Sequence, residues 1–237
     1  MLVLAVTLGL AAVRSLLALL DALSASEPLA DQAVAINAPA RQVELLDLAY
    51  QLSGVVQLTA WGGLGLYLLW RDGIGLPSLG LDRSAPGRDA RLGAGLAALI
   101  GVPGLGLYFL AHAVGLNLTV LPSALDDTWW RIPVLLASAV ANSLAEELLV
   151  VGYLLTRLRQ LGWREGTAVL ASAVLRGAYH LYQGFGGFAG NLVMGLVFGR
   201  VWQRTHRLWA LVIAHALIDV VAFVGYAVLR GRVGWIP

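Results

Sequence analysis

The chain has 237 residues, of which 59% are hydrophobic and 13% are charged, whereas soluble domains carry roughly 25% charged residues. This composition excludes an ordinary soluble domain and predicts an integral membrane protein whose surroundings are a lipid bilayer. The formal net charge of +2 is too small to indicate a nucleic-acid partner. The absence of cysteine from the sequence excludes disulfides, thiolate nucleophiles and cysteine metal sites.

Apolar runs long enough to cross a bilayer recur along the chain. A span needs about 20 residues, so a chain of 237 residues accommodates six to eight spans and leaves little for a separate soluble domain. We therefore predict an all-α fold, a polytopic transmembrane helical bundle that forms a single membrane domain over residues 1–237. The seven predicted spans are 2–23, 48–70, 92–115, 132–156, 166–183, 187–203 and 208–229.

Arginine residues gather in three of the connections between these spans. The three basic connections are 71–91, 157–164 and 200–207. Because basic loops remain on the cytoplasmic side of a membrane, we expect all three loops and the N-terminus to be cytoplasmic. The expected location is a bacterial cytoplasmic membrane.

The fourth predicted span carries two adjacent carboxylates, Glu146 and Glu147, close to the middle of the bilayer. A charged carboxylate at this depth costs about 2.5–3.5 kcal/mol, so both must face protein or water rather than lipid. Adjacent helix residues point about 100° apart. One carboxylate can therefore face a reaction centre while the other faces a supporting partner. Asn142 lies one turn before Glu146 and extends its polar stripe.

The fifth span adds a cation and an imidazole. Arg176 and His180 are four residues apart, which predicts that they share one face of a continuous helix. An arginine inside an apolar run is costly to leave unpaired, and Glu147 or Glu146 is the obvious partner.

The sixth and seventh spans add three more polar residues. His215 and Asp219 are four residues apart in the seventh span and share a face. Asn191, in the sixth span, is a buried polar group that we interpret as a supporting residue that hydrogen-bonds between helices. Ionisable groups within a membrane are functional by default, and here three spans bring them together.

Two kinds of chemistry fit this set. Glu146, His180, His215 and Asp219 are candidate Zn²⁺ ligands, and three of them bound to the ion would leave a fourth position for water. Alternatively, a buried glutamate acts as general base on a water, with the histidines as acid and oxyanion donors. Both routes lead to hydrolysis inside the membrane. The HExxH, GxSG and GxGD signatures of other intramembrane proteases are absent from the sequence.

These motifs resemble those of the CPBP or Abi family, which contains the CAAX proteases and bacteriocin-processing enzymes. The family pattern is EExxxR on one span, FxxxH on the next, and HxxxN or HxxxD on a later one. The corresponding residues here are Glu146-Glu147, His180, and His215 with Asp219. The resemblance covers residues 130–223, which would form the catalytic core.

The resemblance implies an intramembrane endopeptidase that cuts a peptide or the tail of a protein at the membrane. It implies that Glu146 is the water-activating base or a metal-site carboxylate and that Glu147 supports it. His180 would be the partner of Glu146, and His215 with Asp219 would complete the site as metal ligands or as polarising and oxyanion-stabilising groups.

Two positions depart from the family pattern. Val151 stands where the pattern has arginine, and Arg176 stands where it has phenylalanine. Our hypothesis is that the guanidinium has moved to the neighbouring helix and still neutralises Glu147. The alternatives are a non-catalytic immunity or scaffold protein of the same fold, for which Val151 is the main argument, and an ion-coupled transporter, since buried carboxylates and histidines also build proton relays.

Glycines predict two features of the packing around the site. Gly195 and Gly199 form a GxxxG pattern in the sixth span, which permits close contact between helices. The cluster at 184–187 permits a bend, which would help His180 to reach the depth of Glu146.

Overall fold

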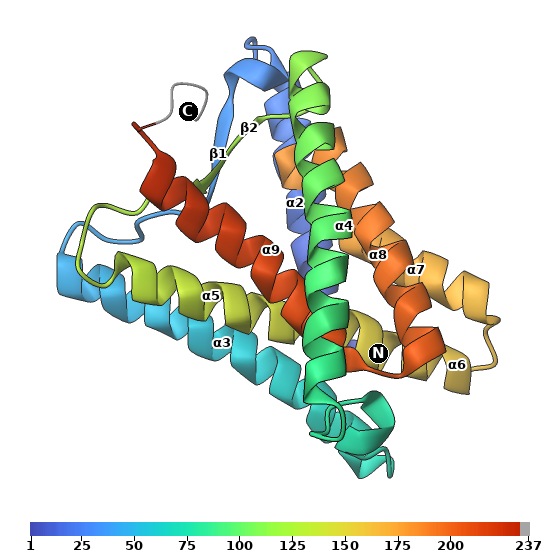
Figure 1. Cartoon of the computed structure of the whole chain (residues 1–237). Helices are drawn as coiled ribbons and strands as arrows, with labels where there is room; N and C mark the ends of the chain where they lie inside the picture. The colour runs from blue at the N-terminus through green and yellow to red at the C-terminus, as the bar shows by residue number, and fades with distance from the viewer. Residues whose placement is uncertain (233–237) are drawn as a thin grey trace.

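The described residues of the computed structural model, 1–232, form a helical bundle with one short two-stranded sheet (Figure 1). This confirms the predicted all-α membrane fold. The long helices and the strands, in chain order, are α2 (Leu10–Ser24), β1 (Ala33–Asn37), α3 (Glu44–Arg71), α4 (Pro86–Ala113), β2 (Thr119–Ser123), α5 (Arg131–Glu146), α7 (Glu165–Ala178), α8 (Phe185–Thr205) and α9 (Leu208–Leu229). The short helical elements are α1 (Leu2–Leu4), α6 (Thr156–Gln160), two π-helical stretches at Ala5–Gly9 and Glu147–Leu155, and 3₁₀ turns at Leu29–Asp31, Leu76–Leu79 and Leu181–Gln183.

All seven predicted spans are helical, but only five of them are long and apolar enough to cross a membrane within the described residues. These five are Leu2–Ser24, Glu44–Arg71, Pro86–Ala113, Arg131–Gln160 and Leu208–Leu229. The fifth predicted span, 166–183, is longer than the observed helix. Helix α7 has 14 residues and therefore extends over only about 21 Å. A bilayer core is about 30 Å thick. The sixth predicted span, α8, is a 21-residue helix outside this group of five.

The span that contains the two glutamates lies at the centre of the bundle. It consists of α5, the π-helical stretch Glu147–Leu155 and α6, and every residue from Ala145 to Leu155 is buried. Helices α3 and α9 pack against α5, and α7 packs against the π-helical stretch. π-Helices are rare and frequently occur at functional sites, and this one begins at Glu147.

The three basic connections lie together at one end of the bundle. Arg157 forms an ion pair with Asp72, and Glu165, directly after the second connection, accepts hydrogen bonds or ion pairs from Gln203 and Arg200 of the third. The three basic connections therefore lie on the same side of the bundle, as the sequence predicts. The cytoplasmic location of this end stays a prediction.

Arg207 joins the first basic connection to the start of α9. Its guanidinium donates to Asp89 at 2.5 and 2.8 Å and to Asp82 at 2.9 Å. Hydrogen bonds from Ser84, together with Arg207, lower the pKa of Asp82 to about 2. Asp82 thus remains charged, and this contact persists, down to a pH well below neutrality.

The two strands lie at the opposite end, where the pair α3–α5 diverges from α2 and α4 (Figure 1). β1 and β2 are parallel, with Ala33 opposite Thr119 and Asn37 opposite Ser123. This sheet was not expected from the sequence. Its strands are only five residues long and are separated by two long helices, so neither gives a clear local pattern.

Helices α7 and α8 are held close together by glycine, as the GxxxG pattern predicts. A Cβ at Gly195 would lie 2.8 Å from the Cα of Ala173, whereas a Cβ at Gly190 of the same helix would lie 3.6 Å from the nearest atom, the Cδ2 of Leu107. We therefore expect Gly195→Ala to lower the free energy of unfolding in detergent micelles by about 1–3 kcal/mol through overpacking. Gly190→Ala is the matched control and should be nearly neutral; equal effects of the two substitutions would argue against close packing at Gly195.

Candidate active site

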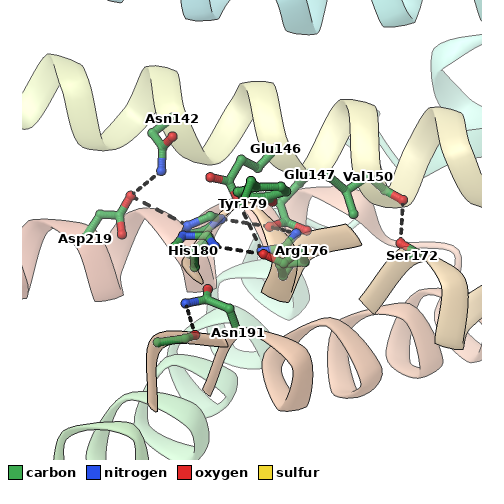
Figure 2. Close-up of polar contacts among 12 residues, drawn as sticks. Asn142, Glu146, Glu147, Val150, Ser172, Arg176, Tyr179, His180, Asn191 and Asp219 are labelled. Atoms are coloured by element: carbon green, nitrogen blue, oxygen red, sulfur yellow. Dashed lines mark hydrogen bonds and ion pairs between the residues drawn. The ribbon is translucent and has the colours of Figure 1, made fainter. Parts of the chain in front are cut away.

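The polar side chains predicted from three spans meet in one buried cluster (Figure 2). Glu146 ends α5 and Glu147 begins the π-helical stretch, while Arg176 lies in the last turn of α7. His180 follows α7, and His215 lies in α9. The structure therefore brings together residues that are far apart in the chain, such as Asn142 and Asp219, which are 77 positions apart.

Glu147 and Arg176 form a fully buried ion pair. The Nη2 of Arg176 donates to the Oε1 of Glu147 at 2.6 Å, and both side chains are 0% exposed. The Nη1 of Arg176 also lies 3.5 Å from the Oε2 of Glu146. The contact expected from the relocated arginine is thus present, while Val151 is buried among apolar residues of the core.

Glu146 faces a cavity, whereas Glu147 lies behind it. The side chain of Glu146 lines a cavity of about 480 Å³, and Glu147 is not among its lining residues. The Oε2 of Glu146 accepts a hydrogen bond of 2.6 Å from the hydroxyl of Tyr179. The two carboxylates thus have different surroundings, a cavity for Glu146 and an ion pair for Glu147, and a reaction centre at Glu146 stays a prediction.

His180 lies beyond the end of α7 instead of within a continuous helix. The helix ends at Ala178, and a 3₁₀ turn at Leu181–Gln183 leads to Gly184, whose φ of +108° is readily adopted only by glycine. The predicted continuous helical face of Arg176 and His180 is therefore wrong, although the break at the glycine cluster is present. The Nδ1 of His180 lies 2.9 Å from the carbonyl oxygen of Arg176. Because a carbonyl only accepts, Nδ1 carries a proton and Nε2 is left for the cavity.

His215 lies between two carboxylates. Its Nδ1 is 2.8 Å from the Oε1 of Glu147, and its Nε2 is 3.6 Å from the Oδ2 of Asp219. Asn142 donates to the same oxygen of Asp219 at 2.9 Å, as the dashed lines of Figure 2 show. The side chain of Asn142 thus holds Asp219, and Glu147 holds the imidazole ring of His215.

The cavity extends well beyond the charged cluster. Its walls come from α3, α5, α8, α9 and β1, together with residues of the segment 179–183 after α7. Asn191 lines it and donates to the carbonyl of Gly187 in its own helix at 3.0 Å. This hydrogen bond does not join two helices, so our interpretation of Asn191 as an interhelical bond is wrong, although the residue lies at the site.

Sequence reasoning missed Tyr179 and Tyr182, which both line the cavity. The signal was present, because Tyr179 is three residues after Arg176 and next to His180. Apolar aromatic residues are common in membrane spans, however, and the predicted continuous helix gave no reason to single out these two.

The side chains do not form a ready metal site. Within residues 1–232, no three His, Cys, Asp or Glu side chains are arranged to hold one metal ion. The Oε1 of Glu147 is engaged by both Arg176 and His215, and the Oδ2 of Asp219 by Asn142. Because this arrangement does not fit a shared ion, we derive no catalytic step through zinc.

Replacement of Tyr179 by phenylalanine tests its contact with Glu146. The substitution removes the hydroxyl that donates to the carboxylate at 2.6 Å and keeps the ring. Hydrogen bonds to charged groups contribute about 1.5–3 kcal/mol, so we expect at least a roughly tenfold loss of activity and a change in its pH profile. Tyr50→Phe, at the outer part of the same cavity, is the control. An unchanged pH profile in Tyr179→Phe would contradict a role in tuning Glu146.

Comparison with known proteins agrees with this arrangement. Residues 128–221 match a family described as type II CAAX prenyl endopeptidase Rce1-like. No curated protein and no solved structure matches the chain. The matched segment contains Glu146, Glu147, Arg176, His180 and His215, and it nearly coincides with the predicted core, 130–223. The resemblance to the CAAX proteases is therefore confirmed, in the form of a match of residues 128–221 to the Rce1-like CAAX endopeptidase family.

Proposed function

We propose that the chain is an intramembrane endopeptidase that hydrolyses a peptide bond of a membrane-associated peptide or protein tail. The observation that carries this proposal is the position of Glu146. It lines the cavity together with His180 and Asp219, and it is the carboxylate that Tyr179 holds there. The Rce1-like match over residues 128–221 supports the same class of reaction.

The reaction begins with a water molecule between Glu146 and the scissile carbonyl. Glu146 takes a proton from the water, and the resulting hydroxide attacks the carbonyl carbon. The oxyanion is stabilised by a hydrogen-bond donor that lines the cavity, and His215 supplies it, while the unprotonated Nε2 of His180 accepts a hydrogen bond from the attacking water. Glu146 then returns the proton to the leaving amine, and the carbon–nitrogen bond breaks.

Glu147, Arg176 and Asp219 position the reacting groups in this scheme. Arg176 balances the charge of Glu147 and reaches toward Glu146. Glu147 and Asp219 flank the ring of His215 and fix its orientation. The presence of a guanidinium at Glu147 favours a working site over the scaffold alternative, because the loss of arginine at position 151 is offset by Arg176.

The test is cleavage of a fluorogenic peptide library by the purified protein in detergent, with and without a zinc chelator. We expect cleavage that Glu146→Ala abolishes. Loss of cleavage on chelation would favour the zinc route, and unchanged cleavage would favour the route through Glu146 alone. Peptides bound without cleavage would support the scaffold alternative, and ion flux in liposomes would support the transporter.

A further inference from the structure

The two-stranded sheet has one closed edge. Beside its pairing with β1, the chain at β2 is bonded on its other side. The N–H of Leu118 donates to the carbonyl of Gln183 at 3.0 Å, and the N–H of Val120 donates to the hydroxyl of Tyr108 at 3.1 Å. Pro122, the next residue on that side, has no N–H to satisfy. The outer edge of β2 is therefore occupied.

The other edge of the sheet belongs to β1 and is open. The N–H of Thr119 donates to the carbonyl of Gln32. Because the backbone groups of alternate residues in a strand point to opposite sides, the even-numbered residues of β1 face β2; at the end of the strand, the carbonyl of Asn37 also turns to that side and accepts from the N–H of Ala124. Ala33 and Ala35 then direct their N–H and C=O groups away from it, to a side on which residues 1–232 place no further strand. Ala33 is exposed and Ala35 is half-buried.

This open strand leads into the cavity of the candidate active site. Ile36 and Asn37, at the end of β1, line the same cavity as Glu146 and His180. The sheet is also tied to the segment that carries His180. Gln183 accepts the hydrogen bond from Leu118, and Gly184 forms an antiparallel bridge with the residue just before Leu118. The edge of β1 is thus held in a defined position relative to His180.

A substrate inside a membrane needs such an edge. A peptide that enters as a helix has its carbonyl groups engaged in its own hydrogen bonds, and it must unwind before a water can attack one of them. Unpaired backbone groups cost several kcal/mol each where water is excluded. Addition to an exposed strand supplies replacement partners for the peptide backbone.

We propose that the substrate peptide binds in an extended conformation as a third strand along β1, and that this pairing delivers its scissile carbonyl to Glu146. The inference rests on the proposed endopeptidase function and specifies how the substrate is held. Recognition then depends mainly on the substrate backbone, with alternate side chains directed into the cavity, whose apolar walls include Val55, Leu58 and Met194.

The first arm of the test removes a donor from the open edge. Ala35→Pro eliminates one N–H that faces the substrate and keeps those that face β2, and proline is tolerated on edge strands in this orientation. We expect kcat/KM for a fluorogenic peptide that the wild-type protein cleaves to fall about tenfold, which corresponds to about 1.4 kcal/mol. Ala38→Pro, an exposed position just after β1, is the matched control and should be unaffected.

The second arm alters the peptide and uses the wild-type protein. It therefore tests whether the substrate pairs with β1 even if Ala35→Pro fails to fold. N-methylation of single peptide amides should reduce kcat/KM at every second position near the cleaved bond, because only alternate amides face β1. Cleavage with no alternation, together with equal rates for Ala35→Pro and Ala38→Pro, would overturn strand addition and leave the endopeptidase function standing. Failure of the wild-type protein to cleave any peptide would overturn both.

Discussion

Glu146→Gln is expected to lower the rate of peptide cleavage by about 10²–10⁴-fold, which is the contribution of a general base. Glutamine keeps the size of the side chain and still accepts the hydrogen bond that Tyr179 donates at 2.6 Å. It cannot take a proton from water. The loss should therefore appear in kcat, while the fold and the affinity for peptide are retained.

A matched substitution shows that the effect belongs to this carboxylate. Glu165 lies at the start of α7, and 56% of its side-chain surface is exposed. Glu165→Gln should leave cleavage unchanged. If Glu146→Gln retained more than a tenth of the wild-type rate, Glu146 would not be the base.

Arg176→Leu is expected to lower the free energy of unfolding by about 3–5 kcal/mol, because removal of one partner leaves a buried charge uncompensated. Arg176 and Glu147 are both 0% exposed, so water cannot replace the lost contact. Unfolding measured in detergent micelles checks this value. Arg159→Leu is the control, because the side chain of Arg159 is 46% exposed and its ion pair with Glu165 spans 4.0 Å; surface pairs contribute only about 0–1 kcal/mol.

A second substitution distinguishes charge compensation from packing. If the instability of Arg176→Leu comes from the charge on Glu147, then Arg176→Leu combined with Glu147→Gln should regain a large part of the lost free energy. Exchange of a buried ion pair for neutral side chains is often nearly neutral. A double variant no more stable than Arg176→Leu would instead assign the effect to the volume of the arginine side chain.

Much of the site could be predicted from the sequence, because an ionisable side chain inside a membrane is costly unless it contacts a partner or water. Carboxylates, histidines and an arginine in apolar spans must meet one another or water, so Glu147 was expected to contact a cation and does contact Arg176. His215 and Asp219 also share a helix face, as their spacing of four residues predicts, because α9 is a regular helix throughout that stretch.

Other features depend on contacts that no local pattern contains. The end of α7 before His180 follows from the path of the chain across β2, through the bridge between Asn117 and Gly184. The contact between Tyr179 and Glu146 depends on that same path. The π-helical geometry from Glu147 onward was also outside the prediction, since spacing arguments assume 3.6 residues per turn.

The ion pair between Glu147 and Arg176 restricts the order in which substitutions could have accumulated. An ancestor with arginine at position 151, as in the family pattern, reaches the present sequence by one gain and one loss of arginine. Loss first would leave Glu147 buried without a cation, at a cost of about 3–5 kcal/mol. Gain first would keep Glu147 paired throughout, because Arg176 contacts it at 2.6 Å whichever residue occupies position 151. We therefore expect that Arg176 was gained before the arginine at position 151 was lost. Relatives that carry both arginines should be stable proteins.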